Sequence, residues 1–269
     1  MNTAVMNPPN VQTSLRLGCV SFLNAKPLIY GLDDEPRVAL SLEVPSKLAD
    51  LLERGAVDVA LLPVIDYQRL SGLRLIRAGG IACNGPTLTV RIFSKVPIDQ
   101  IETLACDPDS HTSVALAAVL MAERWGRRPR QVDLRDPNLS ADTPRLLIGD
   151  KVITEEPQGF PHQLDLGAAW KDLTGLPFVF AAWMARPGAV LGDWPARLER
   201  AKREGLANVD KILARHAGAL GWPTDIARRY LTEYLRFDIG DREIEAIEEF
   251  HRLAAKHGLI ASPVQPIRF

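Results

Sequence analysis

The sequence contains few of the residues that build disulfide frameworks or metal sites. Its three cysteines, Cys19, Cys83 and Cys106, stand apart from one another within apolar runs. There is no C-x-x-C pair, and the five histidines lack the spacing of an H-E-x-x-H motif. Phosphate-binding glycine loops and dinucleotide fingerprints are also missing. We therefore expect buried free thiols, no metal site and no organic cofactor.

The chain also lacks an excess of charge and any long hydrophobic run. It has 32 Lys and Arg against 33 Asp and Glu, a formal net charge of −1 at pH 7. This balance gives no basic field for nucleic acid or for an anionic membrane. Apolar stretches such as VALLPVI are far shorter than the ~20 residues that span a bilayer. We expect a small-molecule ligand, with neither nucleic acid nor membrane as partner, and the pattern leaves the oligomeric state open.

The first residues, MNTAVMNPPNVQTS, do not resemble a secretory signal. They have no basic start, no apolar core and no cleavage-like end. We expect residues 1–14 to be a disordered lead-in and the protein to be cytoplasmic.

Strand and helix patterns alternate along the first third of the chain. Strands are predicted over residues 15–20, 37–44, 57–64, 73–83 and 88–96. A helix is predicted over 46–55, with Ser46 as its N-cap and Gly55 at its end. Short connections between these elements indicate a parallel sheet with right-handed crossovers.

A second α/β unit follows, and the last eighty residues are helical in pattern. The second unit has predicted helices over 110–126 and 165–175 and an apolar strand over 176–186. The predicted architecture is therefore α/β with two lobes and a ligand cleft between them. One lobe is assigned residues 15–95 and 187–269, and the other is assigned 96–186. Hinge segments are expected near 94–104 and 184–193.

Polar residues follow several predicted strands, at the sheet edge where α/β proteins bind ligands. Ser21 and Asn24 follow the first strand, and the Gly85–Pro86 turn presents Thr87 and Thr89. Each also has a simpler interpretation, because Asn24 can merely close a turn and Thr89 can be an ordinary strand residue.

Two further stretches belong to the same predicted edge. A helix start carries Ser110, Thr112 and Ser113, where free amides and the helix dipole favour an anion. Gly149 and Asp150 follow another strand. Ser110 can also be only a helix cap and Asp150 only a surface ion-pair partner, but together the stretches favour a small carboxylate ligand.

Six motifs in this chain resemble a known enzyme family. They occur in order between about residues 15 and 260: SFLNAKPL, GPTLTVRIFSKVP, HTSVALAAVL, LLIGDKVI, DLGAAWKDLTGLPFVFAAW and FHRLAAKHGL. Together they resemble the chorismate dehydratases of the futalosine route to menaquinone. The resemblance implies the two-lobed type II periplasmic-binding-protein fold. It also implies removal of water from chorismate to give 3-[(1-carboxyvinyl)oxy]benzoate.

The resemblance assigns roles to the edge residues. Asn24 and Thr89 are the expected catalytic residues, orienting the enolpyruvyl arm or the departing hydroxyl. The expected substrate-binding residues are Ser21, Ser110, His111, Thr112, Ser113, Gly149 and Asp150. Thr89 replaces the serine usual in the family, and His111 replaces an arginine, which leaves the role of His111 in doubt. The base is either Asp150 or the side-chain carboxylate of the substrate.

Two other functions fit the same pattern. A solute receptor of a transporter shares the fold, but a receptor must be exported and the first residues do not resemble a signal. The sister enzyme that makes 1,4-dihydroxy-6-naphthoate is also similar in fold. Its chemistry is expected to need a histidine base in the cleft, for which His111 is the candidate.

Overall fold

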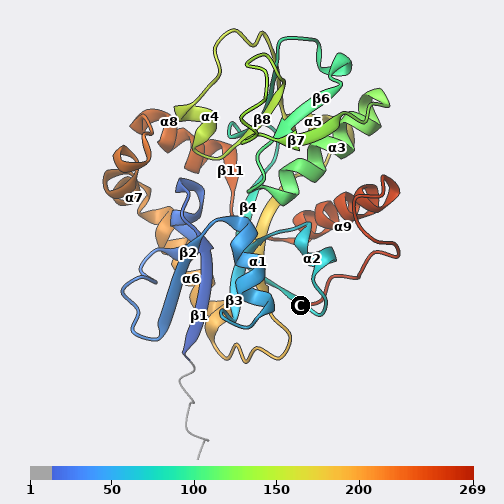
Figure 1. Ribbon diagram of the computed structural model, residues 1–269. Coiled ribbons are helices and arrows are strands. Elements are labelled where there is room, and N and C mark those ends of the chain that lie inside the picture. The colour runs from blue at the N-terminus through green and yellow to red at the C-terminus, as the bar shows by residue number, and fades with distance from the viewer. Residues whose placement is uncertain (1–13) are drawn as a thin grey trace, which may run out of the picture.

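Strands sort into two sheets that lie one above the other in Figure 1. The computed structural model describes residues 14–269, so the lead-in expected at 1–14 lies outside the described residues except for Ser14. The larger sheet contains β1 (Leu15–Val20), β2 (Val38–Glu43), β3 (Val59–Pro63), β4 (Arg74–Cys83), β10 (Phe178–Ala185) and β11 (Leu235–Arg236). The smaller contains β5 (Val90–Ser94), β6 (Thr103–Cys106), β7 (Arg130–Asp133), β8 (Arg145–Ile148) and β9 (His162–Asp165).

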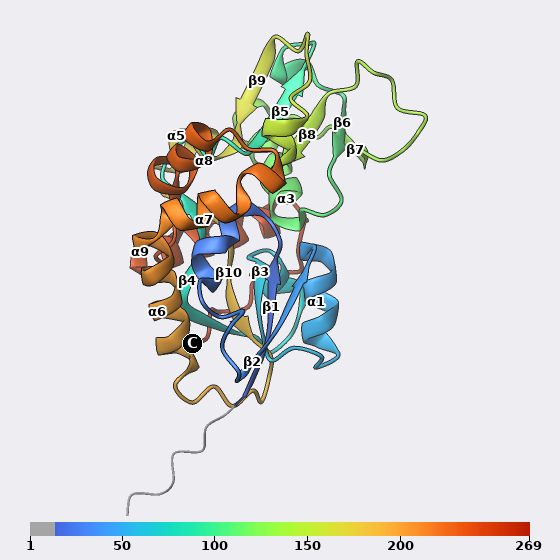
Figure 2. The ribbon, with the colours of Figure 1, turned by 90° about the vertical axis from the view of Figure 1, so that its left-hand side faces the viewer.

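Strand β10 joins the two halves of the larger sheet. The strand order is β11-β4-β10-β3-β1-β2, and β10 runs antiparallel to both β3 and β4. Strands β1, β2 and β3 pair in parallel, as the predicted βαβ pattern requires. Figure 2 shows β10 between β3 and β4. The chain therefore leaves the first lobe after β4, builds the second lobe, and returns through the middle of the first sheet.

The crossings between lobes differ from those predicted. The strand expected at 88–96 in the first lobe is β5, which pairs with β8 and β9 of the second sheet. The strand expected at 176–186 in the second lobe is β10 of the first sheet. The assignment of 15–95 with 187–269 and of 96–186 is therefore wrong by one strand at each crossing. The chain crosses at 84–89 and 175–177, not near 94–104 and 184–193, because cross-strand pairing decides which sheet a strand joins.

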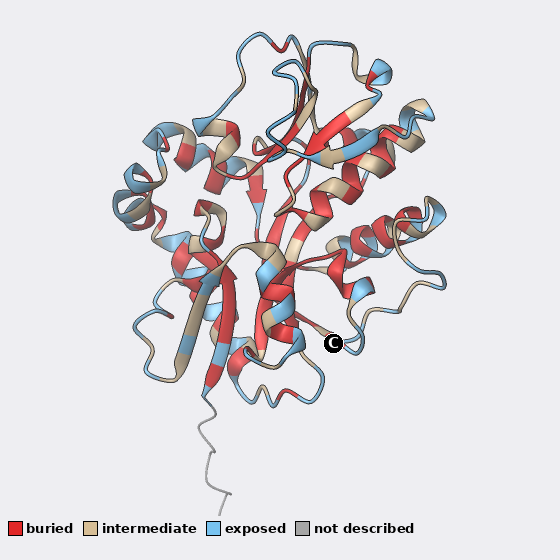
Figure 3. Cartoon of the chain, in the orientation of Figure 1, coloured by how far each residue is buried: buried red, intermediate tan, exposed pale blue. Residues whose placement is uncertain are grey.

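Helices cover both sheets and bring the C-terminal part of the chain to the cleft. The longer ones are α1 (Pro45–Glu53), α3 (His111–Trp125), α5 (Leu166–Thr174), α6 (Trp194–Ala207), α7 (Val209–His216) and α9 (Asp241–Lys256). The shorter ones are η1 (Leu23–Ile29), α2 (Asp66–Arg69), η2 (Ile98–Gln100), α4 (Lys151–Thr154), η3 (Gly218–Leu220), α8 (Thr224–Arg229) and η4 (Tyr230–Tyr234). In Figure 3, β1, β3 and β10 are buried along most of their length, and the main hydrophobic core runs from these strands into the second lobe through α3.

Helix boundaries follow the predicted caps in most places. Ser110 caps α3, its hydroxyl accepting a hydrogen bond from the amide of Ser113 at 3.3 Å. Gly126 and Gly175 end α3 and α5 in left-handed conformations. The cap predicted at Ser46 is wrong, because α1 already begins at Pro45, whose fixed φ suits a first helical position. The three cysteines are buried and free, as expected.

Candidate active site

A cavity that is partly open to solvent lies between the two lobes. Its walls are mostly apolar, with Phe22 and Phe180 among the lining residues. The polar residues that line it are Asn24, Thr87, Thr89, Ser110, Thr112, Ser113 and Tyr230. A mostly apolar cavity with a few polar groups is typical of a small-molecule site.

Asn24 lies on η1, which follows directly from β1. Helix α6 presses closely on η1, because a Cβ built on Gly205 would lie 2.2 Å from the carbonyl oxygen of Pro27. Only glycine allows this approach, and it fixes the position of η1. The Oδ1 atom of Asn24 is buried and has no hydrogen-bond partner within the described residues. An unpaired acceptor in a cavity wall costs stability and therefore indicates a ligand contact.

Tyr230 links Asn24 to Thr89. Its hydroxyl accepts a hydrogen bond from Asn24 Nδ2 at 3.2 Å and lies 2.7 Å from Thr89 Oγ1. The tyrosine ring is buried and stacks on Trp222, with centroids 4.9 Å apart. Tyr230 opens the single π-helical turn η4, a type of turn that often occurs at functional sites. Burial raises the pKa of the Tyr230 hydroxyl, so it remains a neutral group.

The crossover from β4 to β5 is held by Asp165. Its carboxylate accepts hydrogen bonds from the amides of Thr87 and Leu88 at 2.9–3.1 Å, and it also caps α5 through the amide of Ala168. Leu88 has a φ of 69°, a left-handed conformation that is strained for a leucine. Holding this strained segment places both Thr87 and Thr89 in the cavity wall.

The start of α3 forms the opposite wall. Ser110, Thr112 and Ser113 are all buried and line the cavity, as the sequence predicted. The free amides of the first helical turn point toward this end of the helix. The arrangement provides hydroxyl and amide donors, and among the described residues that line the cavity there is no Lys, Arg or His. Such donors at a helix start suit a carboxylate.

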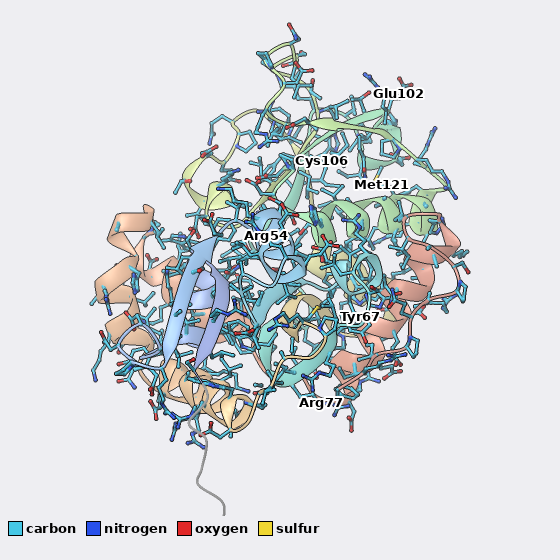
Figure 4. All side chains as sticks on the ribbon, turned by 60° about the horizontal axis from the view of Figure 1, so that its bottom comes forward. Arg54, Tyr67, Arg77, Glu102, Cys106 and Met121 are labelled. Carbon is cyan, nitrogen blue, oxygen red and sulfur yellow. The ribbon has the colours of Figure 1, made fainter. Side chains whose placement is uncertain are left out.

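A corner of the first lobe, residues 64–68, docks on the start of α3. The amide of Ile65 donates to Thr112 Oγ1 at 3.3 Å, and the carboxylate of Asp66 lies 2.9 Å from His111 Nδ1. Figure 4 labels Tyr67 on this corner and Met121 on α3. His111 does not line the cavity, because Asp66 holds its ring outside the wall.

His251 of α9 supports the same corner from behind. Its Nε2 atom donates to the carbonyl of Val64 at 2.8 Å, so Nδ1 is the acceptor of the bond from Gln68 Nε2 at 3.0 Å. Burial lowers the pKa of His251 to about 4. The ring is therefore neutral at pH 7 and fixes the corner through both nitrogens.

Gly149 lines the cavity, whereas Asp150 and Ser21 do not. Gly149 has a φ of 59°, which favours glycine, and its amide donates to the carbonyl of Thr89 at 2.8 Å. The carboxylate of Asp150 accepts a hydrogen bond from Trp222 Nε1 at 2.8 Å, which joins the lobes on the flank away from His111. Burial raises the pKa of Asp150. Ser21 is exposed.

Sequence reasoning missed Tyr230, and it placed Thr87 at the cleft edge without assigning it a role in catalysis or binding. Tyr230 comes from the C-terminal helices, about 140 residues beyond Thr89, and no local pattern distinguishes it from a core tyrosine. Asp165 was likewise missed, although its place as N-cap of the helix predicted at 165–175 was a usable signal.

The part of the chain that the structure describes has neither a cluster suited to a metal ion nor a helix suited to a membrane. Across residues 14–269, no group of three or more His, Cys, Asp and Glu is arranged to hold a metal ion. Within the same range, no helix has the length and apolar character to cross a bilayer.

Comparison with solved structures identifies the fold. A protein of Archaeoglobus fulgidus superposes with a TM-score of 0.74 at 18% identity, over 93% of this chain and 100% of that one. The alkanesulfonate-binding protein SsuA of Xanthomonas axonopodis, bound to MOPS, gives 0.65 at 14% identity, over 94% and 96%. The two-lobed periplasmic-binding-protein-like fold predicted from the sequence is thus confirmed.

Comparison with curated proteins identifies the family. The chorismate dehydratase of Thermus thermophilus is 30% identical over 245 residues, 81% of this chain and 87% of the relative. That of Campylobacter jejuni is 26% identical over 240 residues, 87% and 94%. A family model described as menaquinone biosynthesis matches residues 15–256. The chain therefore belongs to the menaquinone biosynthesis family, and it is similar to chorismate dehydratases over most of its length.

Proposed function

We propose that this protein is a chorismate dehydratase, which eliminates water from chorismate to give 3-[(1-carboxyvinyl)oxy]benzoate in menaquinone biosynthesis. The observation that carries the proposal is the interlobe cavity, whose lining includes both Asn24, with its unpaired acceptor, and a helix start rich in hydroxyls. Similarity to two chorismate dehydratases over most of the chain supports the same activity. We place the protein in the cytoplasm as part of this proposal.

The reaction is driven by the substrate. The ring of chorismate is one double bond short of aromatic, and loss of water completes it. A proton leaves the ring carbon that bears the enolpyruvyl ether, and hydroxide leaves the neighbouring carbon, together forming water. The difficult step is removal of the proton, because its electron pair must first be accommodated in the ring and its carboxylate.

The start of α3 stabilises that charge. Electrons from the broken C–H bond delocalise through the conjugated ring to the ring carboxylate. Donors already aimed at this group lower the barrier, because they need no rearrangement as the charge grows. In this proposal the Thr112 and Ser113 hydroxyls and the amides of the first turn bind the ring carboxylate.

Asn24 and Thr89 hold the other end of the substrate. Chorismate carries one hydroxyl, which is its single hydrogen-bond donor when both carboxylates are ionised. The unpaired Oδ1 of Asn24 accepts from this hydroxyl, and Thr89 contacts the enolpyruvyl arm. Thr89 keeps the hydroxyl of the serine expected in the family, so the replacement preserves the contact.

The proton acceptor in this proposal is the carboxylate on the substrate's own enolpyruvyl arm. Among the described residues that line the cavity there is no carboxylate, histidine or lysine. Asp150, the protein base considered from the sequence, is engaged by Trp222 outside that lining. This arrangement also argues against the naphthoate-forming sister reaction, because His111 faces Asp66 and not the cavity.

The test is direct. Purified protein is incubated with chorismate, and product is identified by its aromatic absorbance and by mass. The Asn24→Ala protein, prepared in the same way, controls for contaminating enzymes. Formation of 3-[(1-carboxyvinyl)oxy]benzoate by the wild type alone supports the proposal, and unchanged chorismate refutes it.

A further inference from the structure

The hydroxyl of Tyr230 is bonded on two sides within the cavity wall. Asn24 Nδ2 donates to it at 3.2 Å, and Thr89 Oγ1 lies 2.7 Å away, where either oxygen can be the donor. Thr89 and Tyr230 are 2% and 1% exposed, so bulk water does not compete for these bonds. The three side chains therefore form one short chain of hydrogen bonds.

The chemistry of the groups sets the direction of this chain. A phenol is more acidic than an aliphatic alcohol, so its hydroxyl is the stronger donor and the weaker acceptor. Having accepted from Asn24, Tyr230 donates to Thr89, and the hydroxyl hydrogen of Thr89 is then left for the cavity. The amide of Asn24, a residue that lines the cavity, is held with its NH₂ group toward Tyr230, and Oδ1 is buried without a partner among the described residues.

We propose that Tyr230 is a positioning residue that fixes the hydrogen-bonding polarity of the site. By holding the amide of Asn24 and receiving no hydrogen from Thr89, it presents one acceptor, Asn24 Oδ1, and one donor, the Thr89 hydroxyl. This pairing matches chorismate, which offers one hydroxyl to donate and many oxygens to accept. The inference rests on the proposed function and extends it to a residue from a third segment of the chain.

Burial of the tyrosine supports this role over acid–base catalysis. Removal from water raises the pKa of Tyr230, so the hydroxyl keeps its proton throughout the working pH range. The ring stack on Trp222 and the π-helical turn hold its oxygen at a fixed place. A fixed, neutral hydroxyl sets the direction of the hydrogen bonds to Asn24 and Thr89, and this direction stays the same in every turnover.

The first test compares Tyr230→Phe with Tyr234→Phe. Both remove one tyrosyl oxygen from η4, but that of Tyr234 is bonded to Arg229 at the surface. We expect kcat/KM for chorismate to fall about tenfold or more in the first variant and to stay within twofold in the second. Thermal melting verifies that both fold. Equal activities would overturn the inference, while a wild type that leaves chorismate unchanged would overturn the proposed function and the inference with it.

The second test separates positioning from packing. The dissociation constant of the reaction product, which has carboxylates but no hydroxyl, is measured by calorimetry. Tyr230→Phe is introduced into three backgrounds: wild type, Thr89→Ser, which keeps the hydroxyl, and Thr89→Ala, which lacks it. We expect it to weaken product binding in the first two backgrounds and to change it by less than twofold in Thr89→Ala, where Tyr230 has no hydroxyl to orient. A packing role predicts the same loss in all three backgrounds, and that result would overturn the inference.

A third measurement leaves Tyr230 in place, in case its phenylalanine variant does not fold. Fluorotyrosine is incorporated at the four tyrosines, and the Tyr230 signal is assigned by replacing the other three with phenylalanine. We expect product to shift the Tyr230 fluorine resonance in wild type and Thr89→Ser and to shift it much less in Thr89→Ala. A fluorine shift that does not depend on the Thr89 hydroxyl would contradict the inference.

Discussion

The two walls of the cavity are built in different ways. The first wall combines Asn24, Thr89 and Tyr230, which come from three distant segments and share one buried chain of hydrogen bonds. The second wall consists of Ser110, Thr112 and Ser113, which are consecutive or nearly so at one helix start. The geometry of the first wall therefore depends on the whole fold, whereas that of the second wall depends on one local helix start.

This difference predicts different kinetic effects. In the proposed function, the first wall holds the end of chorismate from which water departs, and Asn24 Oδ1 is its acceptor without a partner among the described residues. The second offers several parallel donors to a carboxylate that is present in substrate and product alike. Changes in the first wall should therefore lower kcat, and changes in the second should mainly weaken binding.

The largest expected effect is that of Asn24→Ala. Loss of one polar contact to the transition state typically costs about 10²–10³ in rate, and we expect kcat for chorismate to fall by that factor. Steady-state kinetics should show a much smaller change in KM. Asn208→Ala, which alters an exposed asparagine bonded to Glu204, is the matched control and should retain normal kinetics. Near-normal turnover in a folded Asn24→Ala protein would make Asn24 only a turn residue.

Ser113→Ala should have the next largest effect, and on binding. A hydrogen bond to a charged group contributes roughly 1.5–3 kcal/mol, so affinity for the product should drop at least about tenfold. The helix cap at Ser110 remains, so thermal stability should change little. Exposed Ser71→Ala is the control. If calorimetry finds the same dissociation constant in both variants, the carboxylate binds elsewhere and the second wall is structural.

Acid should weaken the corner at 64–68, which His251 holds against the second wall, before it affects the first wall. The folded-state pKa of His251, about 4, is below the value of about 6.5 for an unfolded chain. The unfolded state therefore binds the extra proton first, and stability is lost as pH falls from about 6.5 toward 4.

Urea unfolding across this pH range measures the loss. The slope for one proton is at most about 1.4 kcal/mol per pH unit. His216→Gln removes another histidine whose pKa is lowered and should leave most of the slope in place. A flat profile between pH 6.5 and 5 would show that His251 does not hold the corner at 64–68 in its neutral form.

The smallest expected effect concerns the Asp150–Trp222 bond on the other flank. Burial raises the pKa of Asp150, so its charged form costs stability at pH 7. Asp150→Asn keeps an acceptor for Trp222 and removes that cost, and a rise in Tm of roughly 2–4 °C is expected at pH 7. The gain should shrink as pH falls and the wild-type carboxyl takes up its proton. A lower Tm at pH 7, measured beside wild type, would mean that the charge itself holds the lobes.

Sequence reasoning reached the second wall more fully than the first. Ser110, Thr112 and Ser113 were predicted because caps and helix starts are local patterns. Asn24 and Thr89 were predicted from strand ends and the family resemblance. Tyr230 was not, because only tertiary packing of η4 brings its hydroxyl to Thr89. The resemblance places His111 in the site, but no local pattern shows that Asp66 holds its ring outside the cavity.

The strand errors have a similar origin. Periodicity located β5 and β10 within two residues but assigned each to the wrong sheet. Buried strands can have similar apolar composition in either sheet. The sheet that a strand joins depends on the neighbouring strand with which it pairs in register.

The insertion of β10 between β3 and β4 also has a consequence for biosynthesis. A ribosome that has made residues up to Cys83 has synthesised β3 and β4, but their common neighbour, Phe178–Ala185, is still about ninety-five residues away. The first sheet cannot close until the intervening lobe has been synthesised. Nascent chains will therefore expose the facing edges of β3 and β4 for several seconds at typical bacterial elongation rates of about 5–20 residues per second. Such unpaired edges attract other strands, which makes this interval the one in which the protein depends most on chaperones.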